Sequence, residues 1–216
     1  MQSSLVTASE DGVGNVLKWI LLAVAIACFA ALGWATKQTY EGSPPFPDRF
    51  TTKAGAVVMT ADDITAGKSG FQKADLMDYG SLYGMGSYFG EDYTADNLKR
   101  IAELAEENIA QARYGKPFAT VPAEQQAAVK AEMQASLQGI DLTAGTAVLA
   151  DAVADAIATR RGQIEQWLTH HDDAKGWTQA YSLNAAEARQ TADFLIYSSL
   201  TTVARRPGSP ASWTQN

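Results

Sequence analysis

The two histidines of this 216-residue chain, His170 and His171, are adjacent, and two aspartates follow them directly. Imidazole and carboxylate groups are common Zn²⁺ ligands, so this cluster is the first candidate for a metal site. The pair closes a predicted helix, however, and neighbouring residues of a helix point in different directions. We therefore interpret the cluster as a solvated helix terminus and assign it no ligand.

Other residue types that support catalysis occur without the spacing that catalysis needs. Asp62-Asp63 is typical of a helix N-terminus and Glu106-Glu107 of a solvated helix face. No serine lies in a GxSxG or SxxK pattern. The single cysteine, Cys28, excludes an intrachain disulfide, a thiolate metal cluster and a CxxC pair. With no CxxCH and no glycine-rich phosphate loop either, the chain is not predicted to be catalytic by itself.

Residues 81–92, SLYGMGSYFGED, crowd three glycines and three aromatic residues together. Glycine at this density indicates positive φ angles or a close approach of the backbone to another group. The aromatic residues indicate a loop that is buried or lies at an interface. Nothing beside this run resembles a nucleophile, a metal cluster or a phosphate cradle.

Composition and charge narrow the class of protein. The length suits one modest domain with an additional segment, and 46% of the residues are hydrophobic, as in a folded protein. The net charge is −7, and the basic clusters are no longer than Arg160-Arg161 and Arg205-Arg206. Because nucleic-acid binding normally needs a basic face, no nucleic-acid partner is expected.

Residues 16–36 are predicted to form a transmembrane helix. The run is almost uniformly apolar apart from Lys18, and Trp19 and Trp34 lie near its ends. About 20 apolar residues cross the hydrocarbon core, and tryptophan is enriched at membrane interfaces. A cleaved signal peptide is the alternative, because small residues could supply a cleavage site: Ala27, Ala30 and Ala31. We favour the uncleaved anchor because the run is longer than a usual signal-peptide core. The flanking charges do not determine its orientation.

The rest of the chain predicts a mainly α protein, in which the membrane helix precedes a compact helical domain with a small β-hairpin. A tail at 1–15 precedes the membrane helix, a proline-rich connector at 37–50 follows it, the domain occupies 51–207, and 208–216 form a second tail. The hairpin is expected in 49–60 and a turn region in 140–148. Helices are expected within 61–76, 94–115, 121–139, 151–171 and 184–208. Thr60 and Thr94 are predicted N-caps, and Gly115 a helix end.

Three stretches together resemble the N-terminal region of the quinol-dependent nitric oxide reductases, members of the haem-copper oxidase superfamily. They are TYEGSPPFPDRF at 39–50, the block from Thr60 to Leu98, and ADFLIYSSLTTVARRPG at 192–208. The resemblance runs from about Trp34 to Asn216, and the central block is its most specific part. It implies a cytochrome c-like domain that has lost its haem.

The resemblance also locates that loss. The family's cytochrome pattern is a CxxCH followed by a segment of the kind TLLGEGAYF, which residues 81–89 resemble. The CxxCH positions here hold Leu76, Met77, Asp78, Tyr79 and Gly80. Both thioether cysteines and the histidine ligand are replaced, so covalent haem c is excluded on chemical grounds.

The resemblance gives the glycine-aromatic run a role. In related reductases this element lies against the catalytic subunit, where a backbone carbonyl and a tyrosine hydroxyl help to complete a calcium site. By position these ligands are Gly86 and Tyr88. Oxygen ligands suit Ca²⁺, but two neutral ones are too few, so acidic ligands are expected from the catalytic portion.

The family's haem b, haem b3, non-haem iron and quinol site belong to a run of membrane helices that this sequence does not contain. We expect a fragment of a longer polypeptide, or a separate subunit that associates with the catalytic portion. The expected role is accessory: the domain caps the catalytic portion on the periplasmic side of the inner membrane. The alternative is a free-standing, membrane-anchored helical module that binds other proteins.

Overall fold

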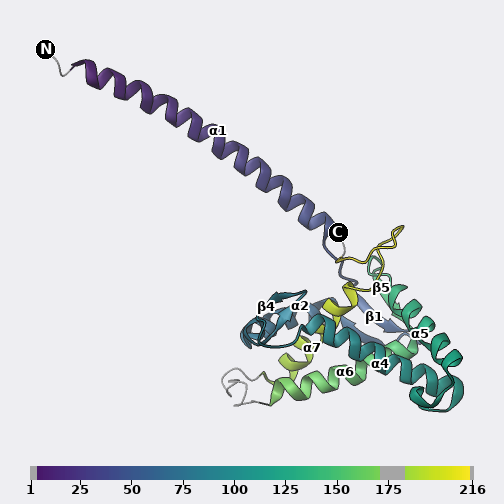
Figure 1. Cartoon of the computed structure of the whole chain (residues 1–216). Helices are drawn as coiled ribbons and strands as arrows, with labels where there is room; N and C mark the ends of the chain where they lie inside the picture. The colour runs from purple at the N-terminus through teal and green to yellow at the C-terminus, as the bar shows by residue number, and fades with distance from the viewer. Residues whose placement is uncertain (1–3, 171–182, 215–216) are drawn as a thin grey trace. The chain divides into compact units, whose positions relative to one another are not determined.

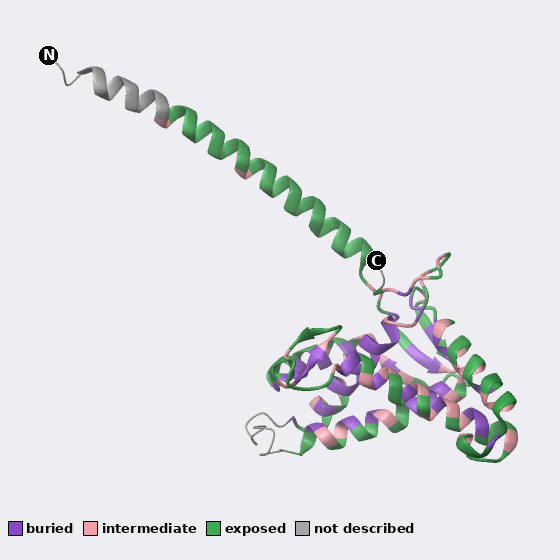
Figure 2. Cartoon of the chain, viewed as in Figure 1, coloured by how far each residue is buried: buried purple, intermediate pink, exposed green. Residues whose placement is uncertain are grey.

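The computed structural model describes residues 4–170 and 183–214, with side chains from Gly14 onward. The chain forms two compact units, Met1–Ser43 and Pro44–Asn216. The first unit is dominated by helix α1, Ser4–Gly42 (Figure 1). Its segment Gly14–Gly42 is long and apolar enough to cross a membrane, and none of its most apolar window is buried (Figure 2). Helical structure therefore continues beyond the predicted span, into the first residues of the predicted connector.

A three-stranded sheet with the order β2-β1-β5 begins the second unit. Strands β1, Arg49–Thr52, and β2, Val57–Thr60, are antiparallel and form the predicted hairpin. Strand β5, Thr146–Leu149, pairs in parallel with the other edge of β1. The prediction of a turn region at 140–148 was therefore wrong for residues 146–148, which belong to β5. This strand pairs with β1, which is far away in the sequence. The inner face of the sheet buries Phe50, Met59, Ala147 and Leu149.

The remaining elements confirm a mainly α fold. A second hairpin consists of β3, Ser81–Leu82, and β4, Met85–Gly86. The described helices of this unit are α2 Ala61–Lys73, α3 Leu76–Tyr79, α4 Tyr93–Tyr114, the 3₁₀ helix η1 Phe118–Thr120, α5 Ala123–Gln138, α6 Asp151–Thr169 and α7 Ala185–Thr201.

Helix α7 is the central element of the domain. Helices α2, α4 and α6 all pack against it (Figure 1). From Thr191 to Thr201 it is buried on almost every side, with Phe194 as the partly exposed residue (Figure 2). Ser198 and Ser199 are buried there because their hydroxyls donate to the carbonyl oxygens of Phe194 and Leu195, at 2.8 and 2.9 Å. This part of α7 is therefore buried around most of its circumference rather than along one apolar face.

A buried ion pair links the sheet to two of these helices. The Nε of Arg161 on α6 lies 2.6 Å from Oδ1 of Asp193 on α7, and its Nη2 donates to the carbonyl oxygen of Val58, also at 2.6 Å. Burial raises the pKa of Asp193 to about 6, although the charge of Arg161 acts in the opposite direction. Because a buried charge is costly without its partner, this pair fixes how α6 and α7 pack.

The ends of the helices follow local chemistry. The hydroxyl of Thr60 accepts a hydrogen bond from the backbone N–H of Asp63, which confirms Thr60 as the cap of α2. Gly115 ends α4 with a φ of 62°, as predicted. The cap of α4 is Asp92, whereas the prediction had named Thr94. Asp92 accepts from the N–H of Ala95, so the helix starts earlier than expected.

The segment after α7 is folded onto the domain. Helix α7 ends at Thr201, and an antiparallel bridge joins Arg205 to Ser212. Nη2 of Arg206 donates to the carbonyl oxygen of Trp213 at 2.8 Å, and its guanidinium lies 5.5 Å from the centroid of that indole ring. Part of the predicted tail at 208–216 therefore has defined structure.

Candidate functional site

The glycine-aromatic run forms a tight β-hairpin that leads into an exposed loop. Ser81 pairs with Gly86 and Leu82 with Met85. The two residues between the strands, Tyr83 and Gly84, have φ angles of 56° and 74°. Two successive positive φ angles are typical of a type I′ turn, whose twist matches that of the strands. Glycine suits this conformation, whereas tyrosine adopts it at a cost.

Asp92 joins this hairpin to helix α4. One carboxylate oxygen caps the helix, while the other accepts from the hydroxyl of Ser81 at 2.7 Å and from the N–H of Gly84 at 2.6 Å. Burial alone raises the pKa of Asp92, but the hydrogen bonds from Ala95, Ser81 and Gly84 outweigh it and hold that pKa below its usual value of 3.8. The ionised carboxylate is therefore the form that stabilises this corner.

Tyr83 holds the turn against the core. Its N–H donates to the hydroxyl of Thr94 at 2.9 Å, and its own hydroxyl lies 3.0 Å from that of Thr201 on the central helix. On the other strand, the N–H of Ser87 bonds to the carbonyl oxygen of Met77 at 2.9 Å. These contacts fix the base of the hairpin and offset the strained conformation of Tyr83.

The predicted calcium ligands Gly86 and Tyr88 lie at the other end of this hairpin. Gly86 is exposed with a φ of 135°, and the side chain of Tyr88 is 94% exposed. Phe89 is completely exposed and Met85 is 64% exposed. The structure brings both predicted ligands to one exposed loop, where an external group could reach them. Their role as ligands stays a prediction.

Residues 76–80, which the family resemblance aligns with CxxCH, form the short helix α3 and the residue after it, Gly80. Tyr93 fills the space beside them, because its hydroxyl donates to the carbonyl oxygen of Leu76 at 3.0 Å and its ring lies against Gly80. A Cβ atom on residue 80 would lie 2.7 Å from the Cζ of Tyr93 and 2.6 Å from the carbonyl oxygen of Glu91. A side chain that ligates haem does not fit there. The residues present therefore do not suit a covalently attached haem.

Aromatic rings occupy the neighbourhood of Tyr93. Phe71 meets it edge to face at 6.2 Å between centroids, and Trp167 lies at 5.9 Å. Phe194 of the central helix lies 5.5 Å from Phe71. Burial raises the pKa of Tyr93, and the charge of Glu91 raises it further. The hydroxyl is thus a neutral donor that serves structure rather than acid-base chemistry.

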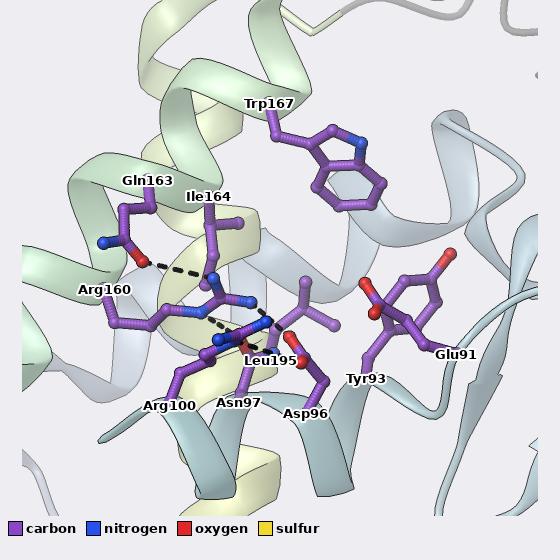
Figure 3. Close-up of a pocket in the computed structure, with 10 residues that line it drawn as sticks. All are labelled: Glu91, Tyr93, Asp96, Asn97, Arg100, Arg160, Gln163, Ile164, Trp167 and Leu195. Carbon is purple, nitrogen blue, oxygen red and sulfur yellow. Dashed lines mark hydrogen bonds and ion pairs between the residues drawn. The ribbon is translucent and has the colours of Figure 1, made fainter. Parts of the chain in front are cut away.

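A charged cavity of about 200 Å³ lies beside this aromatic cluster, between α4 and α6 (Figure 3). Arg160 uses Nη2, Nε and Nη1 to bond Asp96, Asn97 and Gln163, at 2.6, 2.7 and 3.2 Å. Burial lowers the pKa of Arg160 and the charge of Asp96 opposes that shift. Because these contacts occupy the guanidinium, we interpret Arg160 as a link between two helices. The sequence offered no signal for it beyond a basic pair.

The histidine cluster is confirmed as a helix terminus only in part. His170 is exposed at the C-cap of α6, and its Nδ1 lies 2.6 Å from the carbonyl oxygen of Gln166. His171 and the two aspartates after it lie outside the described residues. Within residues 4–170 and 183–214, no three side chains of His, Cys, Asp or Glu are placed to hold a metal ion.

A family model identifies the class of protein to which this domain belongs. Residues 47–216 match the model of the cytochrome c-like domain of the nitric oxide reductase protein NorB. The domain is therefore cytochrome c-like. No curated protein matches the chain significantly.

Because that match covers most of the chain, the chain belongs to the NorB cytochrome c-like family of the nitric oxide reductases. Membership in this family implies that the chain is part of a larger membrane complex. Helix α1 lies outside the residues that match the family model. The apolar helix and the family together indicate that the chain is anchored in a membrane.

Proposed function

We propose that this chain is the haem-free accessory part of a quinol-dependent nitric oxide reductase, and that its second hairpin docks against the catalytic portion. The observation that carries the proposal is the exposure of Met85, Tyr88 and Phe89 on a loop whose base is fixed by Asp92. Large exposed apolar side chains on an ordered loop are typical of a protein interface.

In this proposal the catalytic portion does the chemistry. It takes two electrons and two protons from a quinol and reduces two NO to N₂O and one water, with haem b, haem b3 and non-haem iron as its cofactors. In the described part of this chain, no three side chains of His, Cys, Asp or Glu are placed to hold a metal ion, and these cofactors are assigned to the catalytic portion. The work of the domain is to cap the catalytic portion on the extracytoplasmic side, next to the membrane that α1 enters.

Calcium is the proposed link across this interface. The carbonyl oxygen of Gly86 and the hydroxyl of Tyr88 are the donors that this chain would offer, two residues apart on one exposed loop. Calcium takes about six to eight oxygen ligands and prefers carboxylates. The catalytic portion would therefore have to supply the acidic ligands, and the ion would bind only when both parts are present.

Sequencing of the gene beyond Asn216 and of its neighbours is the first test of this function. It should reveal membrane helices that carry histidine ligands. A stop codon with no reductase gene nearby would contradict the proposal and favour a free-standing binding module.

In the complete enzyme, Tyr88→Phe should lower the calcium content, measured by mass spectrometry of the metal, together with NO turnover. Tyr40→Phe is the matched control, because Tyr40 is also exposed but lies on α1. Unchanged calcium and turnover in Tyr88→Phe would overturn the interface site.

A further inference from the structure

A second cavity, of about 540 Å³, is bordered by α3, by the loop that follows the second hairpin and by the Tyr93–Trp167 contact. Its volume is in the range of small-molecule sites. Four aromatic side chains and two carboxylates line it: Tyr79, Phe89, Tyr93, Trp167, Asp78 and Glu91. Phe89 belongs to both the docking surface and this cavity, whereas the proposed calcium ligands Gly86 and Tyr88 do not line the cavity.

We propose that this cavity binds a small alkylammonium cation. Aromatic faces attract a cation that has lost part of its water, and a quaternary ammonium group is a well-suited ligand for such walls. Tyr93 is buried and Trp167 half-buried, and their rings lie at 42° to each other, so two walls meet at an angle. Figure 3, which draws the adjacent charged cavity, shows Trp167, Tyr93 and Glu91, which line both cavities.

The charges around the cavity favour a cation. Asp78 and Glu91 are both exposed at its rim, and no lysine or arginine is among its lining residues in the part of the chain that the structure describes. Arg160 and Arg100 lie in the adjacent charged cavity, which Glu91 also lines, and Asp96 pairs with them at 2.6 and 3.5 Å. Two carboxylates among aromatic walls offer too few oxygens for a hard divalent metal ion, which would need about six.

The position of the cavity follows from the altered cytochrome segment. Asp78 and Tyr79 belong to α3, at positions where a cytochrome would carry CxxCH, and Phe89 and Glu91 come from the loop after the second hairpin. The backbone of Gly90 passes so close to α3 that a Cβ there would clash with the carbonyl oxygen of Tyr79, and the N–H of Ser81 donates to the carbonyl oxygen of Glu91 at 3.1 Å. The cavity therefore has walls from segments that are fixed to one another.

Calorimetric titration of the full chain with choline tests this proposal. The chain should be held in maltoside micelles, because detergents with a trimethylammonium head group would compete. The comparison ligand is 3,3-dimethylbutan-1-ol, which has the same shape but carbon in place of the charged nitrogen. Choline should bind about tenfold more tightly than this alcohol, since only choline gains the cation–π and carboxylate attraction.

The double variant Asp78→Asn, Glu91→Gln should weaken choline binding about tenfold and leave the alcohol unaffected. Both side chains are exposed, so the fold should persist, and unfolding of the variant can be measured in parallel. Glu124→Gln on α5 is the control for a change of charge outside the cavity. Equal binding of the two ligands, no binding of choline, or binding that the double variant leaves unchanged would overturn the proposal.

Discussion

The two halves of the segment from residue 76 to residue 90 contrast in burial and in attachment. In the first half, Leu76, Gly80 and Ser81 are buried, and Tyr93 packs directly against Leu76 and Gly80. In the second half, Met85, Tyr88 and Phe89 expose most of their surface. Yet the two halves are adjacent in sequence and equally rich in apolar residues.

At the positions that the resemblance aligns with CxxCH, Leu76 and Gly80 are used for packing. Where the cytochrome pattern continues into a glycine-aromatic loop, the side chains face outward, and only the base of the loop is fixed. Substitutions in the first half should therefore change the free energy of unfolding, and substitutions in the second half should change binding.

Gly80→Ala should have the largest effect on stability. The new Cβ would clash with the ring of Tyr93 and the carbonyl oxygen of Glu91, and we expect a loss of about 3 kcal/mol. Denaturant titration of the full chain in maltoside micelles measures it. Gly162→Ala is the control, because a Cβ there meets nothing within 4 Å, and it should stabilise helix α6 by about 0.5 kcal/mol or more. Similar free energies of unfolding for both variants would contradict the role proposed for the contact between Gly80 and Tyr93.

Asp92→Ala should come next, with a loss of about 2 kcal/mol. The change removes the cap of α4 and two hydrogen bonds to the hairpin. Asp92→Asn keeps a capping oxygen and should restore at least part of the loss, which the same titration would show. If the alanine variant were as stable as the original chain, the hairpin would not depend on this corner.

The contribution of Asp92 should also depend on pH. Its pKa in the folded domain lies below the ordinary value of 3.8, so its stabilising effect is complete above that pH and is lost as the pH falls through the lowered value. The stability difference between the original chain and Asp92→Asn should therefore shrink in acid. A constant difference from pH 6 to pH 2 would contradict the lowered pKa.

Tyr93→Phe should cost about 1 kcal/mol, because it leaves the carbonyl oxygen of Leu76 without its hydroxyl partner while the ring stays in place. Thermal unfolding followed by circular dichroism can detect this change. Tyr40→Phe, on the exposed face of α1, should leave unfolding of the domain unaltered. An equally small effect at both sites would mean that the Tyr93 ring alone maintains the packing.

Tyr88→Ala should have the smallest effect on stability, within about 0.5 kcal/mol, because the side chain has almost no contacts to lose. Its effect should instead be on association with the catalytic portion, measured as the calcium content and turnover of the complete enzyme. A clear loss of stability in the chain alone would show that Tyr88 belongs to the packed half.

Local signals predicted part of this fold well. The hairpin in 49–60, the cap at Thr60 and the end of α4 at Gly115 each depend on a few neighbouring residues, and the structure confirms them. Strand β5 was missed because its partner is distant in sequence. The burial of α7 on all sides was missed because buried serines resemble surface residues until their backbone partners are known.

The candidate site was predictable only through the family resemblance. It proposed Gly86 and Tyr88 as calcium ligands, which stays a prediction; periodicity alone would have left them as loop residues. Asp92 and Tyr93 were overlooked, although an aspartate just before a helical stretch is a common N-cap signal. The contact of Tyr93 with Leu76 and Gly80 could not be predicted, because it depends on the packing of the first turn of α4 against α3.

The parallel pairing of β1 with β5 has a consequence for the order of folding. Arg49 and Thr146 are partners although roughly 100 residues separate them, and the central helix α7 comes later still. During synthesis the early strands and α2 must therefore wait for their partners with apolar surface exposed. We expect the domain to fold late and cooperatively, after its last helix has left the ribosome, while α1 is already available to enter the membrane.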